Sequence, residues 1–312
     1  RLRTELQTYA ALKGRTVGLA DFLHDQALDL DDLDRAATGT GRSGWTALRR
    51  DAGLLVAEAG PEEDYFSRRL GDLLHVDDPA RLVVMAAAPN WPALLAAEPA
   101  SPLRTQVQML AYQVDGGQRH AASADEFARR LAAHPAIGSE LAELSALLQA
   151  RSSLNSRPVP GLDDTPLCLH AAYGVREVLT AVGWLTATRR APFQAGVLPL
   201  ASRKTELLFV TLDKSAGYHD RIAYHDYAIS TERFHWQTQN SAGPDTPGGR
   251  RYLDSAANGW QFQLFGRPRK GEPYRACGPV ALVSAEGDRP MSIVWALAVP
   301  LPARLFREYS VL

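Results

Sequence analysis

The sequence contains little cysteine and no long apolar run. Its two cysteines, Cys168 and Cys277, lie more than a hundred positions apart in a chain of 312 residues. This sparse usage excludes the disulfide framework of small secreted domains, so we expect a folded, soluble protein of the reducing cytoplasm. No run of about 18 apolar residues occurs, and the first ten residues lack the apolar core of a signal peptide, which predicts no membrane partner.

The motifs of several enzyme classes are also missing. There is no G-x-x-x-x-G-K-S/T phosphate loop, no H-E-x-x-H or C-x-x-C metal motif, no G-x-S-x-G nucleophile turn and no H-x-K-x4-D nuclease pattern. We therefore predict that this chain is not itself an enzyme and needs no cofactor and no metal. The alternative is a metal-dependent nuclease site, although no standard ligand spacing is present; it would use His219, Asp220, His225, Asp226 and His235.

Lysine is scarce, with four residues, so arginine supplies most of the positive charge. Residues 1–160 carry 17 basic and 21 acidic side chains, whereas residues 161–312 carry 17 and 14. The small positive surplus of the second part is weak evidence for a nucleic-acid partner. Arginine suits bidentate contacts with phosphate or guanine.

The apolar periodicity changes in the middle of the chain. Up to about residue 151, apolar residues recur at helical spacing in short segments such as Glu62–Leu74 and Ser139–Arg151, which predicts an all-α bundle. The stretch Ser152–Pro166 is rich in Ser, Pro and Asp and indicates a linker. We therefore predict one domain over residues 1–155 and a second over 156–312.

The second domain has the pattern of short β-strands. One helix is expected within Tyr173–Trp184, followed by runs rich in Val, Ile, Phe, Tyr and Trp between Gly, Pro and Asp turns. Their spacing favours a β-barrel or sandwich over βαβ units, so the fold class is α+β. The expected strands are Val197–Leu200, Thr205–Leu212, Ile222–Ser230, Phe234–Asn240, Gln261–Gly266, Pro279–Ser284 and Met291–Val299.

The stretch Ile222–Arg251 combines aromatic rings with neutral hydrogen-bonding side chains more densely than any other. Aromatic faces beside amide and imidazole edges suit a flat polar ligand such as a nucleobase. The alternative is that these aromatics are ordinary core of two strands. The candidate base-binding residues are Tyr224, His225, Asp226, Tyr227, His235, Trp236, Gln237, Gln239, Asn240 and Ser241.

Strand alternation divides this stretch between two faces of a hairpin that turns at Ser230–Arg233. Phe234 and Trp236 share one face, where we expect core, and His235 and Gln237 share the other.

Two pocket arrangements remain open. On the polar face, Tyr227 would stack on the base with His225, Gln237 and Gln239 nearby. On the other face, Tyr224 would stack and Asp226 would accept a hydrogen bond from the cytosine amino group.

Cationic side chains accompany this stretch. The loop Ser241–Arg251 contains five Gly and Pro residues before its two arginines, as in loops that follow a phosphate backbone or enter a groove. The alternative is a plain connecting loop with solvated arginines. The candidate DNA-backbone contacts are Arg203, Lys204, Lys214, Arg250 and Arg251.

Several phrases of the sequence resemble one bacterial domain. They are KTELLFVTLDKS (Lys204–Ser215), YHDYAIS (Tyr224–Ser230), FHWQTQNS (Phe234–Ser241), the GGRRY that closes the loop, and EGDRPMSIVWAL (Glu286–Leu297). They resemble the C-terminal domain of bacterial superfamily 2 helicases that often carry a phospholipase-D-type nuclease. The helical part, with GRSGWTALRRDAG, resembles the region between motor and C-terminal domain in those proteins, so the resemblance covers nearly the whole chain.

Proteins of this layout include ATP-dependent type IV restriction enzymes, which defend bacteria by cutting DNA with methylated or hydroxymethylated cytosine. The resemblance implies a helical coupler over residues 1–155 and, over 156–312, an SRA/PUA-like barrel that reads modified cytosine by base flipping. The implied partners are double-stranded DNA with modified cytosine and the helicase and nuclease domains of a parent chain.

Because the chain starts at Arg1 rather than Met, we expect a fragment or a processed chain. The motor and nuclease parts are missing from it, so their activities are not carried over. The remaining alternative is a structural module that docks a helicase motor without reading a base.

Overall fold

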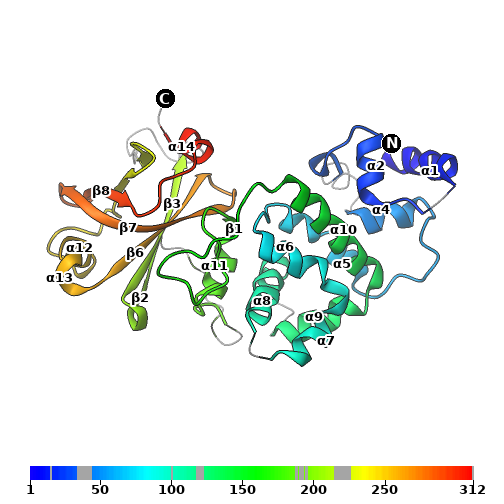
Figure 1. Ribbon diagram of the computed structural model, residues 1–312, viewed down its shortest axis with the longest axis horizontal. Helices are drawn as coiled ribbons and strands as arrows, with labels where there is room; N and C mark the ends of the chain where they lie inside the picture. The colour runs from blue at the N-terminus through cyan, green and yellow to red at the C-terminus, as the bar shows by residue number, and fades with distance from the viewer. Residues whose placement is uncertain are drawn as a thin grey trace. The chain divides into compact units, whose positions relative to one another are not determined.

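The computed structural model describes residues 1–14, 16–33, 44–99, 101–116, 123–186, 189, 193, 196–213 and 226–310. The chain divides into two compact units (Figure 1). The helical unit comprises Arg1–Ser156 and Arg176–Arg190, and the sheet unit comprises Arg157–Val175 and Ala191–Leu312. The sequence placed residues 176–190 with the strands, whereas the structure groups them with the helices.

The helical unit is built from short helices, as the apolar spacing predicted. Polar caps begin some of them: Asp78 accepts a hydrogen bond from the Ala80 amide, and the Ser123 hydroxyl accepts one from the Glu126 amide. The elements are α1 (Leu2–Lys13), α2 (Leu19–Asp25), α4 (Trp45–Asp51), α5 (Glu63–Ser67), η1 (Leu70–Leu73), α6 (Pro79–Ala86), η2 (Ala88–Asn90), α7 (Trp91–Ala97), α8 (Pro102–Val114), α9 (Ala124–Ala132), α10 (Pro135–Arg151) and α11 (Val175–Ala181).

Large aromatic side chains fill the core of this unit, among them Trp45, Phe66 and Trp91. A buried carboxylate begins α4: Glu140 accepts hydrogen bonds from the Trp45 and Thr46 amides, both at 2.8 Å. Burial raises the pKa of Glu140, and these hydrogen bonds oppose the rise. Within the described residues no single helix has the length and apolar composition of a membrane span; only the bent pair Pro79–Ala86 and Ala88–Ala97 meets both, when counted together.

A buried ionic cluster explains why residues 176–190 belong with the helices. The Glu177 carboxylate on α11 accepts a hydrogen bond from the guanidinium of Arg81 on α6, and it lies 2.7 Å from Nε2 of His75. Arg81 and Glu177 are both completely buried. A buried charge without a partner costs several kcal/mol, so this pair holds the start of α11 to α6.

The sheet unit contains an eight-stranded sheet in the order β2-β3-β6-β7-β8-β5-β4, and β1 also pairs with β7 (Figure 1). The pair β3–β6 is parallel, and the other strand pairs are antiparallel. The elements are β1 (Ala172–Tyr173), β2 (Val197–Leu200), η3 (Ala201–Arg203), β3 (Thr205–Asp213), β4 (Tyr227–Ala228), β5 (Arg233–Gln237), α12 (Pro247–Leu253), α13 (Ser255–Asn258), β6 (Gln261–Arg269), β7 (Tyr274–Glu286), β8 (Ser292–Leu297) and α14 (Ala303–Tyr309).

The sheet is mixed and open rather than a closed barrel. Strand β7, at 13 residues, pairs with β6 along its first part and with β8 along its second, so it connects the two ends of the sheet. Within the described residues, β2 and β4 end the strand order and do not pair with each other. The α+β class is confirmed, whereas the SRA/PUA-like barrel is not, because closure needs a pairing between these end strands.

The core of the sheet unit is rich in aromatic rings. Trp236, Tyr252, Phe262 and Trp295 pack against one another, with ring centroids of neighbouring pairs 5.0–6.2 Å apart, and Phe234 belongs to the same core cluster. They come from β5, α12, β6 and β8. This cluster positions the end of β5 against α12, where the candidate site lies.

Candidate functional site

The hairpin β4–β5 separates polar from apolar side chains as the alternation predicted. Tyr227 is opposite His235 and Ala228 is opposite Phe234. Phe234 and Trp236 are buried, whereas His235 is half-buried. On the half-buried face the Tyr227 and His235 rings stack, with centroids 5.0 Å apart and planes at 22°. These two candidate base readers therefore already use ring faces on each other.

The Asp226 carboxylate has a structural contact. The side chain is buried and accepts a hydrogen bond from the Gln237 backbone amide at 2.8 Å. It therefore fixes the open end of the hairpin. Tyr224 and His225, which the two pocket arrangements also need, lie outside the described residues, as does Lys214.

A cavity of about 230 Å³ opens at the end of β5. It brings together three candidate base readers, Trp236, Gln239 and Ser241, and one candidate backbone contact, Arg251. The remaining lining residues come from β2, β3, α12 and the chain before it: Val197, Pro199, Glu206, Ala242, Thr246, Gly248 and Tyr252. His235, Gln237 and Asn240, also candidates, do not line it.

Aromatic rings form one side of this cavity. The Trp236 and Tyr252 rings meet edge to face, with centroids 5.4 Å apart and planes at 88°. Both also pack against the buried Trp295 ring. Because both walls are locked into the core, they hold their orientation without a ligand, which lowers the entropic cost of binding.

A buried carboxylate beside Tyr252 also lines the cavity. Glu206 on β3 is fully buried and accepts hydrogen bonds from the Arg251 guanidinium at 2.5 Å and from the Tyr252 hydroxyl at 2.8 Å. The Arg251 guanidinium also lies over the Trp260 ring, 4.5 Å from its centroid. Burial and the Glu206 carboxylate raise the pKa of Tyr252 well above its ordinary value, so its hydroxyl stays protonated.

Sequence reasoning missed Glu206 and Tyr252. The only local signal for Glu206 is one acidic residue inside the apolar strand TELLFVTLD, where a buried charge requires a partner. That partner lies 45 positions away at Arg251, and no sequence period connects the two.

The stretch predicted as the loop Ser241–Arg251 is helical in its second half. The Thr246 hydroxyl accepts a hydrogen bond from the Gly249 amide and caps α12, which begins at Pro247. A Cβ at Gly249 would collide with the Gly243 carbonyl. These glycines therefore allow close packing of the turn against the helix, and the part that contains the arginines is not a free loop.

Most of the candidate backbone cations have partners inside the sheet unit. Arg203 forms a two-pronged ion pair with Asp164 at 2.7 and 2.6 Å, and the Lys204 ammonium donates to the Asn258 carbonyl at 3.2 Å. Arg251 is held by Glu206. Arg250 is exposed on α12. Arg251 is thus a wall of the cavity rather than an outward-facing contact.

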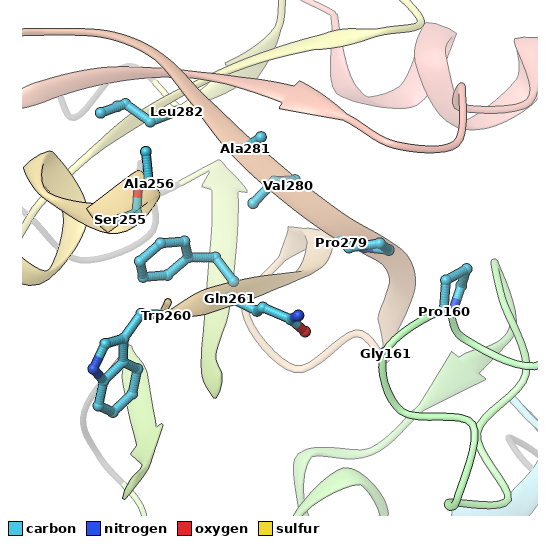
Figure 2. Close-up of a pocket in the computed structure, with 11 residues that line it drawn as sticks. Pro160, Gly161, Ser255, Ala256, Trp260, Gln261, Pro279, Val280, Ala281 and Leu282 are labelled. Atoms are coloured by element: carbon cyan, nitrogen blue, oxygen red, sulfur yellow. The ribbon is translucent and has the colours of Figure 1, made fainter. Parts of the chain in front are cut away.

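A second hollow, of about 460 Å³, lies between α13, the start of β6 and the middle of β7. Figure 2 shows Trp260 and Gln261 around it with Val280, Ala281 and Leu282 of β7. It contains none of the residues chosen from the sequence, and its lining is mainly apolar. Its lining includes Trp260, the residue whose ring lies under the Arg251 guanidinium.

The nuclease alternative finds no support among the residues that the structure describes, since no three His, Cys, Asp or Glu side chains there are grouped to hold a metal ion. Three of the five residues that it would use, His219, Asp220 and His225, lie outside the described residues.

Residues 167–309 match the family model described as Domain of unknown function (DUF3427). The matched range runs from just before β1 to the end of α14 and therefore contains every lining residue of the 230 Å³ cavity. No curated protein matches the chain.

Proposed function

We propose that the sheet unit is a DNA target-recognition module that holds a flipped modified cytosine, 5-methyl or 5-hydroxymethyl, in the cavity beside Trp236 and Tyr252. One observation carries the proposal: a single cavity collects Trp236, Gln239 and Ser241, all chosen from the sequence as base readers. The DUF3427 domain, often found in helicase-associated proteins, supports a place in a cytoplasmic type IV restriction enzyme with helicase and nuclease domains. An SRA-like architecture belongs to the same proposal.

The size and chemistry of the cavity suit one base. Its volume of about 230 Å³ is below the range of about 300–1,000 Å³ for pockets that enclose drug-sized ligands. Trp236 and Tyr252 contribute small exposed parts of their side chains, 6% and 3%, and the exposed Gln239 and Ser241 offer hydrogen-bonding groups. The Arg251 guanidinium supplies donors for the acceptor atoms of a pyrimidine edge.

These contacts can offset the cost of extrusion. Flipping a base costs a few kcal/mol, and each base–aromatic stack contributes about 1–3 kcal/mol. Glu206 does not contact the base in this arrangement. It positions Arg251 and Tyr252, and it prevents the guanidinium from turning outward.

The test compares matched duplexes that carry cytosine, 5-methylcytosine or 5-hydroxymethylcytosine at one target, by fluorescence anisotropy at constant salt. The double variant Gln239→Ala, Ser241→Ala should lose the preference for a modified duplex by about 1–3 kcal/mol and keep its weaker binding to unmodified DNA. Asn240→Ala is the matched control, because Asn240 is exposed between these residues and does not line the cavity.

A second readout reports extrusion directly. The fluorescence of a 2-aminopurine placed beside the target increases when the neighbouring base leaves the stack. This increase should be seen with the modified duplexes that the chain prefers. Equal affinity of the unaltered chain for all three duplexes would contradict base reading and favour a docking module. Cleavage of unmodified duplex that depends on Mg²⁺ would favour the nuclease alternative.

A further inference from the structure

A groove lined by charged side chains lies where strands β3 and β6 of the sheet unit end. This groove, of about 560 Å³, lies between the β6–β7 turn and α14. Three arginines line it, Arg269, Arg275 and Arg304, together with two glutamates, Glu272 and Glu308, and the apolar side chains of Leu212 and two prolines. None of these residues was chosen from the sequence, and the base cavity does not include them.

The groove lies within a local excess of positive charge. Segments 267–275 and 303–309 contain six arginine and lysine residues and two glutamates, in a chain whose net charge is −1. A surplus of this kind on one face attracts polyanions and is screened by salt. The cations Arg203 and Arg251, chosen from the sequence, also pair with carboxylates of the sheet unit, but their side chains are only 33% and 21% exposed.

The two arginines at the sides of the groove can exchange their partners. The Arg269 side chain is 69% exposed and lies 2.9 Å from Glu272, and the Arg304 side chain is 77% exposed and lies 3.2 Å from Glu308. Ion pairs this exposed contribute about 0–1 kcal/mol, so a phosphate can replace the carboxylate at little cost. Arg275 is half-buried and donates to the His170 carbonyl at 3.3 Å, which keeps its guanidinium in place.

The backbone that carries these arginines is constrained. Pro268 and Pro273 flank the β6–β7 turn, and Gly271 has φ +94° in it. The neighbouring Arg267 guanidinium lies over the Tyr274 ring at 4.4 Å and donates to the Thr211 hydroxyl at 2.8 Å. Proline fixes its own φ, so the turn holds its shape before any ligand binds.

We propose that this groove binds the phosphodiester backbone of DNA without regard to sequence, through Arg269, Arg304 and Arg275. It lies about 20 Å from the base cavity along β3, from Glu206 to Leu212, a length that about six base pairs cover. The proposal goes beyond base reading and rests on the proposed function only for naming DNA as the polyanion.

The test measures binding of the full chain to an unmodified duplex of mixed sequence between 50 and 200 mM salt, a range in which phosphate contacts change affinity steeply. The variant Arg269→Gln, Arg304→Gln should lower the slope of log K against log salt by about two, one for each lost phosphate contact. The matched control is Arg68→Gln, Arg129→Gln in the helical unit, which removes the same charge from two exposed arginines and should leave the slope unchanged.

Three outcomes overturn the proposal: an unchanged slope in the groove variant, an equal loss in the control variant, or no duplex binding by the unaltered chain. Failure of base reading looks different. In that case the unaltered chain shows no preference for modified over unmodified duplexes, while the groove variant still lowers the slope of log K against log salt on unmodified DNA. If instead the groove proposal fails and base reading holds, the groove variant keeps the preference for modified duplexes and has the same salt slope as the unaltered chain.

Discussion

The two units bury charge in different ways. In the helical unit, Arg81 and Glu177 are both completely buried, so their pair closes a core. In the sheet unit, Glu206 is equally buried, but the side chain of its partner Arg251 remains 21% exposed and lines a cavity. The comparison shows that a buried carboxylate can either complete a core or hold a cation at a binding surface, depending on what its partner faces.

This difference has an energetic consequence. Removing one member of a fully buried pair strands a charge and costs about 3–5 kcal/mol, whereas water can solvate the partner in a half-open pair. The same substitution should therefore be more damaging in the helical unit than at the cavity.

The largest effect is expected in the helical unit. Glu177→Ala leaves Arg81 charged and buried, so the free energy of unfolding should fall by about 3–5 kcal/mol, measured by urea denaturation followed by circular dichroism. Asp72→Ala is the control, because Asp72 pairs with Arg69 while both side chains are nearly half exposed, and it should cost less than about 1 kcal/mol. Equal losses in the two variants would show that the ionic cluster does not hold α11.

The pH dependence should also separate the units, because they bury titratable groups of opposite type. Burial, followed by the charges of Arg157 and Arg275, lowers the pKa of His170 in the sheet unit from 6.5 to about 4. The unfolded chain therefore takes up this proton first, and stability present above pH 6.5 is lost as the pH falls toward 4, by up to about 3 kcal/mol. Glu140 in the helical unit has the opposite effect on stability. Because its pKa is raised in the folded state, the folded state takes up the proton before the unfolded chain does, and this contribution to stability rises as the pH falls.

Hydrogen exchange read by mass spectrometry can follow each unit across this pH range. His170→Asn is the informative variant, because His170 has φ +66°, a conformation that asparagine tolerates better than most residues. The variant should flatten the acid-side loss in the sheet unit and leave the helical unit unchanged. An unaltered profile would mean that other groups carry the acid sensitivity of the sheet unit.

The smallest of these effects on stability is expected at the cavity. Glu206→Gln keeps a hydrogen-bonding group beside Arg251 and Tyr252 but removes the charge, so it should cost about 1–3 kcal/mol in urea denaturation. It should also reduce the preference for modified duplexes, because Arg251 is no longer held at the cavity wall. Glu177→Gln, measured in the same way, should cost more, and equal losses in the two glutamine variants would remove the distinction between the two pairs. A loss of stability without any change in the preference for modified duplexes would show that Glu206 supports the core and does not act on the cavity.

Much of the local structure was predictable because it depends on near neighbours. The helical spacing before residue 152 and the β-type runs after it predicted the α+β class, and the alternation in Phe234–Gln237 predicted which side chains the hairpin buries. These patterns repeat every two to four residues, so they can be read from a single segment. The choice of Trp236, Gln239 and Ser241 came from the composition of one such segment.

The tertiary structure decided the features that join distant segments. Residues 176–190 belong to the helices because Glu177 meets Arg81, 96 positions away, and the cavity exists because Glu206 meets Arg251 and Tyr252. The order of the strands, which makes the sheet open, was also decided by the tertiary structure. The same holds for the groove that brings Arg269 and Arg304 together. Buried charges select their partners by position in the folded chain, and no local period of the sequence carries that information.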